Sequence, residues 1–543
     1  MCGIFAIVGN VDHIDSATLN KYSNLGDRRG PEYSSLTTPH PRVKLGFHRL
    51  AINGLNSNSH QPITKNNIQV ICNGEIYNYK ELYEELGVTP DTDSDCEVLI
   101  HLYERYGIDG MMQSLDGVFA FVLVDLCKNL CYISRDTYGV RPMFIMKDQT
   151  FLGVASEMKQ LTGLSSSENV EIKQFTPGTY GEFSLGGEEH RIRRFASFPF
   201  MSRMEIPYPS EYLIYKYIGQ ISVRLQEAVK KRVTTSDRPI ACLLSGGLDS
   251  SLITALVAQH FPDRSKLETY SIGLEGSQDL KYAEMVASYL GTKHTSVVVS
   301  EEEFLASIPE VIYAIESYDT TTVRASVGNF LIAKYIKEHS EAKVIFNGDG
   351  SDEMSGGYLY FHEAPSSREF DLECKRLLSN IHYFDVLRSD RCVAYHGLEA
   401  RTPFLDRSLV EHYLTIPKEL RNHKVSKACE KYILRHCFNS SELLPQEVMW
   451  RTKEAFSDGV SSDKKSWFET IQDNIPDFDD GSFDWENLPN PPKTPEQKYY
   501  RSIFEKHYPG RGRIIPYFWM PRFTDATDSS ARTLNIYNAL VKN

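Results

Sequence analysis

Cys2, the second residue of the chain, is the first candidate for covalent chemistry. If Met1 is removed, Cys2 carries a thiol and a free α-amine, and the ordinary pKa of such an amine, roughly 7.7–8.0, leaves part of it neutral near pH 7. A neutral amine can take the thiol proton directly or through one water, so one residue would supply both nucleophile and base. The structural alternative is a small apolar residue at the start of a strand.

Polar residues elsewhere in the first hundred positions could complete a site around this thiol. The side-chain amide of Asn73 and the backbone N–H of Gly74 can form an oxyanion hole for a tetrahedral intermediate. Arg49 could bind an α-carboxylate through two parallel hydrogen bonds, and Glu75 and Asp95 could accept an α-ammonium. Such a set would hold an amino acid with a side-chain amide, and glutamine fits. Taken singly, each residue is more often structural.

A loop in the second half has the composition of a phosphate-binding turn. Ser245-Gly246-Gly247-Leu248-Asp249-Ser250-Ser251 follows a buried-strand pattern and precedes a helical one. Backbone N–H groups, hydroxyls and the helix N-terminus can converge there on an anion. Because the loop has no lysine, it suits a pyrophosphate held by backbone and hydroxyl groups, with Asp249 placed to bind Mg²⁺. An ordinary capped turn is the alternative.

Acidic and cationic residues further along could serve the same phosphate site. Asp352 lies in Gly348-Asp349-Gly350-Ser351-Asp352-Glu353, directly after the next buried strand, and could be the second Mg²⁺ ligand. Asp385 and Arg388 are one helical turn apart and share a face. Lys453 could stabilise charge that develops during adenylyl transfer. A solvated acidic turn is the alternative for Asp352. Without the loop upstream, solvated surface charges would explain Asp385, Arg388 and Lys453.

The elements that must position these residues differ between the two halves of the chain. β-branched and aromatic runs separated by turn residues predict an α+β unit with extensive antiparallel sheet over residues 1–200. We expect a helix over Glu97–Tyr106 and strands over Ile4–Val8, Ile68–Cys72, Val118–Val124, Cys131–Ser134, Met143–Met146 and Phe151–Ala155. Three prolines between Ser197 and Ser210 indicate a linker, which we set at residues 201–210.

Residues 211–543 read as alternating strands and helices, which predicts a parallel sheet with helices on both faces. We expect strands over Pro239–Leu244, Tyr270–Gly273, Ser296–Val299 and Lys343–Asn347, and helices over Glu211–Val233, Lys281–Leu290, Glu302–Glu316 (kinked or interrupted at Pro309) and Ser326–Glu338. A further helix should begin near Asp249, and the chain after Cys374 looks mainly helical. Ligands on such a sheet collect at the carboxyl ends of the strands.

The composition excludes several classes of protein. The chain has 543 residues, of which 41% are hydrophobic and 24% charged, so it is not a largely disordered chain. A net charge of -13 argues against a general nucleic-acid binder. Apolar runs such as Gly117–Val124 are far shorter than the ~20 residues of a membrane span, and the first residues lack a basic leader. The ten cysteines show no Cys-x-x-Cys pair, so we expect a cytoplasmic protein with reduced thiols.

Longer motifs resemble the glutamine-dependent asparagine synthetases of the eukaryotic type over nearly the whole chain. The first half carries Met1-Cys2-Gly3-Ile4, Arg29-Gly30-Pro31, Asn73-Gly74-Glu75-Ile76-Tyr77-Asn78 and Arg135-Asp136-Thr137-Tyr138-Gly139-Val140-Arg141-Pro142. The second half carries Ser245 to Ser251, Thr321-Thr322-Val323-Arg324-Ala325-Ser326, Gly397-Leu398-Glu399-Ala400-Arg401, Pro403-Phe404-Leu405-Asp406 and Lys453 to Gly459. The tail, with Tyr508-Pro509-Gly510-Arg511 and Asp525 to Thr533, is similar as well.

The resemblance implies an N-terminal-nucleophile glutaminase sandwich (class II glutamine amidotransferase, 1–200) joined to an α/β ATP-pyrophosphatase domain of the adenine nucleotide α-hydrolase type (211–543). It implies that glutamine is hydrolysed at Cys2 and that ammonia crosses an internal tunnel. Aspartate would be activated by MgATP to β-aspartyl-AMP, from which ammonia displaces AMP to give asparagine. The family also suggests a homodimer.

By position, the resemblance assigns roles residue by residue. The acyl chemistry would belong to Cys2, Asn73 and Gly74, and glutamine binding to Arg49, Asn73, Glu75 and Asp95. ATP would be bound by Leu244, Ser245, Gly246, Gly247, Asp249, Ser250, Ile272, Gly348 and Asp349, and Mg²⁺ by Asp249 and Asp352. Aspartate would be bound by Thr321, Thr322, Arg324, Asp385 and Arg388, with Asp349 and Lys453 in catalytic roles at the second site.

Two positions depart from the family pattern. Asp349 stands where human-like members have Glu, and its carboxylate is one methylene shorter. Arg28-Arg29-Gly30-Pro31-Glu32 stands where His-Arg-Gly-Pro-Asp is usual, which concerns the packing around the glutamine site.

Three rival interpretations remain. A β-lactam synthetase on the same plan closes a ring intramolecularly and needs no glutaminase chemistry, which Cys2, Arg49, Asn73 and Asp95 argue against. An enzyme acting on tRNA is disfavoured by the net acidity and by the lack of a basic tail. A non-catalytic metabolite-binding protein that keeps the fold would release neither glutamate nor AMP with pyrophosphate.

Overall fold

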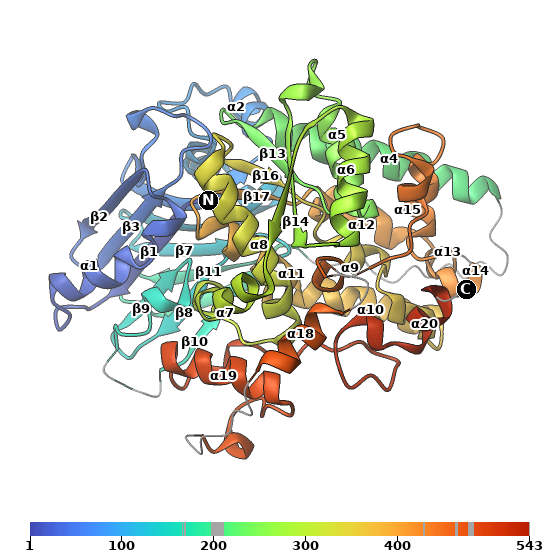
Figure 1. The fold of residues 1–543 in the computed structure, drawn as a ribbon. Helices are drawn as coiled ribbons and strands as arrows, with labels where there is room; N and C mark the ends of the chain where they lie inside the picture. The colour runs from blue at the N-terminus through green and yellow to red at the C-terminus, as the bar shows by residue number, and fades with distance from the viewer. Residues whose placement is uncertain are drawn as a thin grey trace.

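The structure is a computed structural model that describes residues 1–165, 167, 170–196, 211–426, 429–454, 456–461, 465–475 and 483–541. The predicted linker, 201–210, lies outside the described residues. Figure 1 shows the N-terminal strands on one side and the helix-rich remainder of the chain on the other.

The described part of the N-terminal half forms two six-stranded antiparallel sheets, in the orders β10-β8-β9-β1-β3-β2 and β12-β11-β7-β6-β5-β4. Because side chains alternate along a strand, β1 sends Ile4 and Ala6 into a core shared with the second sheet, and Phe5 and Ile7 into a core on its other face. The predicted sandwich is therefore confirmed. Its strands are β1 Gly3–Gly9, β2 Tyr33–His40, β3 Val43–Arg49, β4 Ile63–Lys65, β5 Ile68–Ile76, β6 Gly117–Asp125, β7 Leu130–Arg135, β8 Phe144–Lys147, β9 Phe151–Ala155, β10 Ile172–Gln174, β11 Thr179–Ser184 and β12 Glu189–Arg194.

Helices cover the outer faces of this sandwich. Leu82 and Leu99 lie in one core with residues of β5 and β6, and Leu19 lies in another with residues of β1 and β9. The helices and short 3-10 turns here are α1 Ser16–Asn24, α2 Tyr79–Leu86, α3 Val98–Ser114, η1 Asp27–Arg29, η2 Ser57–Ser59, η3 Asp95–Glu97 and η4 Met158–Gln160.

Strand β5 differs from its prediction in a way that matters for the site. The predicted strand ended at Cys72, but β5 continues to Ile76, and Gly74 pairs with Phe119 of β6. Because Asn73 and Glu75 are polar, the pattern of apolar residues did not predict that the strand continues through them. They are nevertheless fixed on a rigid strand rather than on a loop.

The described part of the C-terminal half contains a five-stranded parallel sheet in the order β15-β14-β13-β16-β17. Ala241 of β13 packs in a core with α7 and α8, whereas its neighbour Cys242 packs in a core with α4, α5 and α6. Helices therefore cover both faces, as predicted. The strands are β13 Ile240–Leu243, β14 Glu268–Leu274, β15 Lys293–Val299, β16 Val344–Phe346 and β17 Glu399–Arg401.

The helices of this half begin and end at recognisable signals. Helix α8 starts at Thr320, before the predicted Ser326, because the Asp319 side chain accepts from the Thr322 backbone N–H at 2.9 Å. Helix α7 continues through Pro309 without the interruption that we considered. The helices are α4 Glu211–Thr234, α5 Leu248–Ala258, α6 Gln278–Leu290, α7 Glu301–Ile315, α8 Thr320–His339, α9 Ser351–Ser355, α10 Ser367–Asn380, α11 Asp385–Ala394, α12 Arg407–Thr415, α13 Lys418–Arg421, α14 His423–Ser426, α15 Tyr432–Phe438, α16 Gln446–Met449, α17 Phe456–Gly459, α18 Trp467–Asn474, α19 Pro495–His507 and α20 Asn535–Val541.

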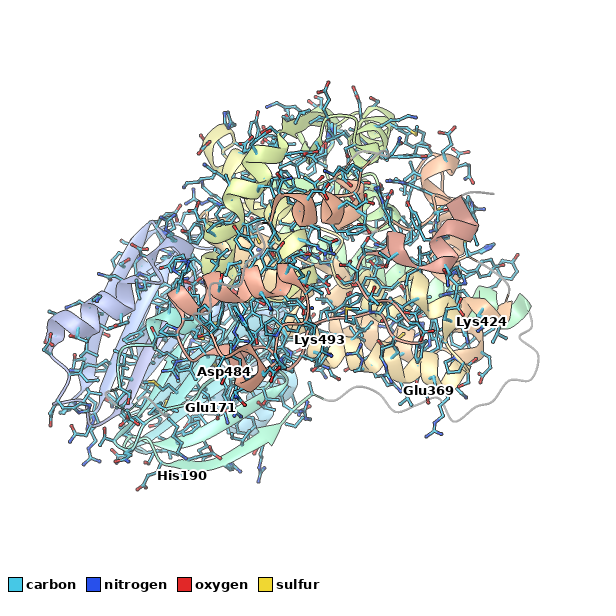
Figure 2. The ribbon with its side chains drawn as sticks, turned by 60° about the horizontal axis from the view of Figure 1, so that its bottom comes forward. Glu171, His190, Glu369, Lys424, Asp484 and Lys493 are labelled. Carbon is cyan, nitrogen blue, oxygen red and sulfur yellow. The ribbon has the colours of Figure 1, made fainter. Side chains whose placement is uncertain are left out.

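Buried ion pairs join the two halves. Arg29 Nη1 lies 2.8 Å from Asp390 Oδ2, and Arg391 Nη1 lies 2.7 Å from Glu157 Oε1. One apolar core also runs from β1 into α7, α8 and α11. By contrast, Figure 2 shows charged side chains such as Glu171 at the periphery of the molecule. The halves are thus locked by buried charge as well as by apolar packing.

Two further observations concern the chain as a whole. The ten cysteines, all of which lie in the described ranges, are free thiols. Among the described residues no helix combines the length and the apolar composition that crossing a membrane requires.

Candidate active sites

Cys2 lies at the start of β1, on the side of the sandwich that faces the second half. Its Sγ donates to the Leu50 carbonyl at 3.6 Å, and burial raises the pKa of the thiol to about 11. The Met1 amine donates to the Leu398 carbonyl at 3.3 Å, and burial lowers the pKa of that amine to about 6. With Met1 attached, the Cys2 nitrogen is an amide and not a base. Removal of Met1 therefore stays a prediction on which activation of the thiol depends.

The adjacent strand presents an amide with no partner. Asn73 is fully buried, and its side-chain nitrogen and oxygen have no hydrogen-bond partner among the described residues. A Cβ on Gly74 would lie 2.5 Å from the Val118 carbonyl oxygen, so the pairing with β6 leaves no room for a side chain there. A buried amide without a partner costs free energy, which a bound oxyanion would recover.

Each of the three charged residues that were predicted to bind glutamine already has a partner. Arg49 Nη1 donates to the Asn56 carbonyl at 2.8 Å, and Arg49 Nη2 donates to the Gly54 carbonyl. Asn53 Nδ2 donates to Glu75 Oε2 at 2.6 Å. A bound α-carboxylate would have to replace the carbonyl contacts of Arg49.

Asp95 is placed by the backbone of β5. Its Oδ2 accepts from the Ile76 N–H at 2.7 Å, and burial raises the pKa of the Asp95 carboxyl to about 6. The carboxyl is therefore largely ionised at neutral pH and available to an ammonium group.

The loop after β13 has the geometry expected for an anion site. Gly246 has φ +72°, and a Cβ there would lie 2.5 Å from the Ala283 nitrogen, so a side chain is excluded twice over. Ser250 Oγ lies 3.2 Å from the Ser245 nitrogen and 3.0 Å from Ser245 Oγ. Gly247 gives helix α5 no side-chain cap, which leaves the first N–H groups of the helix for a ligand.

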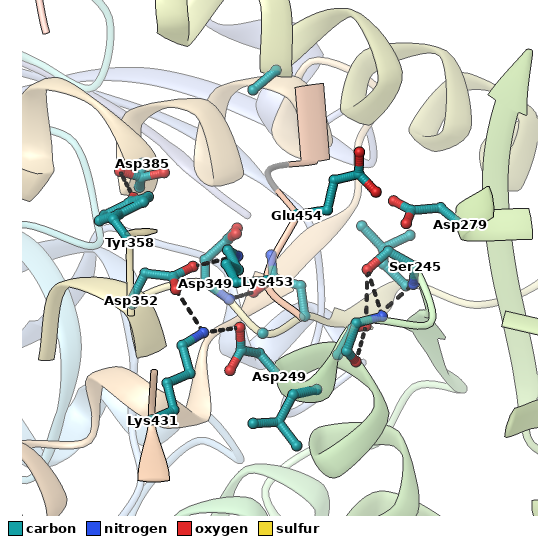
Figure 3. A pocket seen from close by; sticks show the side chains of 18 of the residues that line it. Ser245, Asp249, Asp279, Asp349, Asp352, Tyr358, Asp385, Lys431, Lys453 and Glu454 are labelled. Atoms are coloured by element: carbon teal, nitrogen blue, oxygen red, sulfur yellow. Dashed lines mark hydrogen bonds and ion pairs between the residues drawn. The ribbon is translucent and has the colours of Figure 1, made fainter. Parts of the chain in front are cut away.

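Two lysines contact the predicted Mg²⁺ ligands, and one of them, Lys431, connects the two carboxylates (Figure 3). Lys431 Nζ lies 2.5 Å from Asp249 Oδ2 and 2.6 Å from Asp352 Oδ1. Lys453 Nζ lies 2.7 Å from Asp352 Oδ2. Burial alone would favour a neutral Asp352, but the two lysines hold the pKa of this carboxyl well below its ordinary value. A compact cluster of two carboxylates and two ammonium groups thus faces the serine-glycine loop.

Sequence reasoning missed Lys431. It lies in none of the motifs considered, and 182 positions separate it from Asp249. The chain brings it in through the turn before α15, where Lys431 itself has φ 57°.

A third group of residues closes the other end of the same cavity. Arg388 Nη2 donates to Asp349 Oδ1 at 3.0 Å and to Asp385 Oδ1 at 2.9 Å. The second oxygen of Asp349, Oδ2, has no hydrogen-bond partner among the described residues. Asp349 is therefore anchored by one oxygen and free at the other.

One cavity collects most of the predicted nucleotide, metal and aspartate residues. It is lined by Leu243, Ser245, Gly247, Leu248, Asp249, Ser250, Asp279, Thr321, Ala325, Asn329, Asn347, Gly348, Asp349, Gly350, Asp352, Glu353, Tyr358, Asp385, Arg388, Lys431, Arg435, Arg451, Thr452, Lys453 and Glu454. Figure 3 shows the carboxylates of Asp249, Asp352 and Asp385 entering it from different elements.

Some predicted residues do not line this cavity. Leu244, Gly246 and Ile272 shape the loop and the sheet behind it, and Thr322 faces its capping partner Asp319. Arg324 turns away: its Nε donates to Glu496 at 2.8 Å and its Nη1 to Asp528 at 2.7 Å. In this conformation Arg324 fixes the C-terminal segment rather than a ligand.

Comparisons with known proteins identify the family of the chain. The family model described as a glutamine amidotransferase domain matches residues 1–185, and the model described as asparagine synthase matches residues 220–376 and 367–510. The chain is 42% identical over 570 residues to the glutamine-hydrolysing asparagine synthetase of Gallus gallus and 40% identical over 566 residues to that of Homo sapiens. Each alignment covers 100% of both chains.

Solved structures show more distant likenesses. A glutamine phosphoribosylpyrophosphate amidotransferase from B. subtilis, complexed with ADP and GMP, is 18% identical, with a TM-score of 0.31 over 48% of this chain and 64% of its own. An NMN synthetase from Francisella tularensis is 12% identical, with a TM-score of 0.23 over 55% of this chain and 95% of its own.

Proposed function

The chain belongs to the family of glutamine-hydrolysing asparagine synthetases, and we propose how its residues divide that reaction between two sites. The reaction is the ATP-dependent synthesis of L-asparagine from L-aspartate, with ammonia released from L-glutamine. It passes through β-aspartyl-AMP and yields glutamate, AMP and pyrophosphate. The chain is therefore a carbon–nitrogen ligase with glutamine as the nitrogen donor.

Glutamine is cleaved at Cys2 in this proposal. The thiol attacks the side-chain amide carbon, and its proton passes to the Cys2 amine and then to the leaving ammonia. Asn73 and the Gly74 N–H stabilise the oxyanion, and water then hydrolyses the thioester to glutamate. The unpartnered Asn73 amide supports this assignment most directly. Glu75 and Asp95 hold the α-ammonium of glutamine, and Arg49 exchanges its carbonyl partners for the α-carboxylate.

Aspartate is activated at the second site. The serine-glycine loop holds the pyrophosphate portion of ATP, while the β-carboxylate oxygen of aspartate attacks the α-phosphorus and pyrophosphate leaves. Lys453 stabilises the charge that develops, and Thr321, Asp385 and Arg388 orient aspartate. Ammonia then attacks the β-carbonyl carbon and AMP leaves. The observation that carries this assignment is the single cavity that collects the loop, the carboxylates and the lysines.

The carboxylates suit Mg²⁺. Mg²⁺ prefers one or two carboxylates together with phosphate oxygens and water, and Asp249 and Asp352 face the loop from two elements. Lys431 contacts both carboxylates, and this shared contact with one cation supports the proposed pair of ligands. When bound, Mg²⁺ would neutralise charge on the phosphates. The protein groups that would hold it are Asp249 and Asp352.

The proposal extends to the domains, the path of ammonia, the location and the oligomeric state of the protein. We propose that residues 1–200 and 211–543 act as glutaminase and synthetase domains, and that ammonia crosses between them inside the protein, where it stays unprotonated and away from bulk water. We further propose a cytoplasmic location and a homodimer. The mass in solution, measured by light scattering, tests the dimer.

Variant Cys2→Ala tests the division of labour. It should lose glutamine-dependent synthesis and retain synthesis from ammonium chloride, because the second site is intact. Products are followed as glutamate, asparagine, AMP and pyrophosphate. Loss of both activities in a folded Cys2→Ala protein would contradict two separable sites, and release of neither glutamate nor AMP by the unsubstituted protein would favour a non-catalytic binding protein.

A further inference from the structure

Arg401, in the last strand of the parallel sheet, reaches the glutamine site of the other half. Its Nη2 lies 3.1 Å from Glu75 Oε2. Arg401 is 1% exposed and Glu75 is 3% exposed, so this ion pair is shielded from solvent. A shielded pair between the halves is strong evidence of a fixed arrangement, since either charge alone would be costly to bury.

The guanidinium is held from several sides before it meets Glu75. Arg401 Nε donates to Glu399 Oε1 at 2.9 Å, and Nη2 donates to the Thr235 carbonyl at 3.1 Å. Arg401 Nη1 donates to Thr235 Oγ1 at 3.3 Å and to the Arg232 carbonyl. A planar fork with this many partners cannot rotate freely, so it presents Nη2 to Glu75 in one orientation.

Glu75 depends on nearby cations for its charge. Burial, Glu399 of β17 and Asp95 of η3 raise the pKa of Glu75 well above its ordinary value, and Arg401 and Arg141 oppose this shift. Two ionisable thiols, Cys2 at the start of β1 and Cys96 of η3, also face Glu75.

We propose that Arg401 is a positioning residue of the glutamine site: it holds and orients the Glu75 carboxyl group for the α-ammonium of glutamine. This inference rests on the proposed role of Glu75. Arg401 touches neither glutamine nor the reacting atoms, and acts through Glu75 from the synthetase half of the chain. The glutamine site is therefore completed by a strand of the ATP-binding sheet.

The same strand also supports the second site. The Asn347 N–H donates to the Arg401 carbonyl at 3.1 Å, and Asn347 Oδ1 accepts from the Asp349 N–H at 3.3 Å. The main chain of Arg401 thus contacts Asn347 beside the second site, while its side chain, anchored on Thr235, reaches Glu75. A side-chain substitution leaves the main-chain contact in place.

The experiment compares Arg401→Gln and Arg401→Lys in the full-length protein. Arg401→Gln should raise the KM for glutamine by about tenfold or more, and should leave kcat for synthesis from ammonium chloride within about twofold. Arg401→Lys keeps a charge but loses the fork, so its KM should rise less. Glutamate release and asparagine formation are measured separately from pH 6 to 8.5.

The pH profile separates positioning from a general structural effect. Glu75 binds an ammonium group when it is ionised, so the KM for glutamine rises as the pH falls through the pKa of Glu75. Without Arg401 that pKa is higher, and the rise should begin at a higher pH in Arg401→Gln than in the unsubstituted protein. Thr235→Val, which removes a hydroxyl that contacts Arg401 but keeps the Glu75 pair, should show neither change.

A double-mutant cycle with Glu75→Gln distinguishes the possible failures. If Arg401 acts through Glu75, adding Arg401→Gln to Glu75→Gln should raise the KM no further. An unchanged KM in Glu75→Gln would overturn the role proposed for Glu75. If Glu75→Gln raises the KM and the double variant raises it by the two single effects combined, the role of Glu75 stands and the inference about Arg401 is overturned. An unshifted pH profile in Arg401→Gln would have the same consequence. If Arg401→Gln does not fold, a normal KM and pH profile in Arg401→Lys would overturn it equally.

Discussion

Lys431 shows how individual side chains define the ATP-facing cavity. Its ammonium group contacts both Asp249 and Asp352. Without this cation, less positive charge would offset the repulsion between the two carboxylates. Because Lys453 contacts Asp352 and not Asp249, the two lysines are not equivalent in this cluster. Lys431 is therefore the cation that sets the spacing of the proposed Mg²⁺ ligands.

Variant Lys431→Met should lower kcat/KM for ATP by roughly 10- to 100-fold, since a charge-assisted contact is worth about 1.5–3 kcal/mol. The assay is ATP–pyrophosphate exchange in the presence of aspartate. Lys424→Met, at an exposed lysine, is the matched control and should behave as the unsubstituted protein. Equal rates in the two variants would contradict a role for Lys431.

Asp349 presents a carboxylate oxygen without a hydrogen-bond partner among the described residues to the cavity beside the serine-glycine loop. Asp349→Ala should reduce ammonia-dependent synthesis by roughly 100-fold or more, because the free carboxylate oxygen in the cavity is lost. Asp349→Glu keeps a carboxylate on a side chain one methylene longer and should keep aspartate activation, measured as pyrophosphate exchange. Normal synthesis by Asp349→Ala would refute an essential carboxylate.

At the scale of single residues, the sequence predicted which residues belong to a site better than it predicted the contacts that those residues make. The cavity is reached by Ser245, Asp249 and Arg388. Their motifs lie where a strand of the parallel sheet ends or where a helix packed on that sheet begins. The sequence did not indicate a role for Lys431, because its partners Asp249 and Asp352 lie far away in the chain. Arg324 was assigned to aspartate, yet its guanidinium meets Glu496 and Asp528, and pairs between distant segments cannot be read from spacing.

At the scale of elements, close backbone contacts constrain the turn from β13 into α5. Gly246 needs a positive φ and touches the backbone of α6, while a Cβ on Gly348 would lie 2.8 Å from the Ser250 nitrogen. The turn after β16 therefore approaches the start of α5 closely because Gly348 carries no side chain. That closeness brings the phosphate loop next to Asp349 and Asp352.

Variant Gly246→Ala should abolish aspartate-dependent pyrophosphate exchange and spare glutamine hydrolysis, since its Cβ would collide with the backbone at Ala283. Gly291→Ala is the matched control: φ is +74°, but nothing lies within 4 Å of the added Cβ, so only about 1–2 kcal/mol of backbone strain is expected. Comparable loss of exchange in both variants would show that strain, and not the close approach, is responsible.

Elements with a strong apolar pattern were predicted within a few residues, and short polar ones were not. Strand β9 matches its prediction at both ends, and α4 ends one residue beyond its predicted Val233. Strand β17 was missed because Glu399-Ala400-Arg401 is charged and three residues long. Its side chains find buried partners from distant elements, which no local pattern encodes.

At the scale of the whole molecule, charge is concentrated at the junction between the halves. Glu157 contacts Lys159 and Arg391, and Glu316 accepts from the backbone N–H groups of Met158 and Lys159 at 2.8 and 2.9 Å. Burial opposes ionisation, yet Lys159, Arg391 and Arg29 hold the pKa of Glu157 below its ordinary value. The stability of this junction should therefore depend on pH.

Stability should fall in acid through this junction. A carboxyl whose pKa is lowered by folding contributes fully above its unfolded pKa, about 4.3 for Glu, and loses that contribution as the pH falls further. Glu157→Gln should therefore lower the thermal midpoint at pH 7 and flatten its decline below about pH 4.3. Glu171→Gln, at an exposed glutamate, should leave the profile unchanged. Parallel profiles for Glu157→Gln and the unsubstituted protein would contradict the assignment.

The fate of the glutamine amide nitrogen is the most direct test of two sites that exchange ammonia inside one chain. Glutamine labelled with ¹⁵N in its amide is supplied with MgATP, aspartate and an excess of unlabelled ammonium, and the asparagine is analysed by mass spectrometry. We expect asparagine to carry the label in far greater proportion than the bulk ammonium, because the released ammonia does not equilibrate with solvent. Asparagine with the isotopic composition of the bulk would contradict internal transfer.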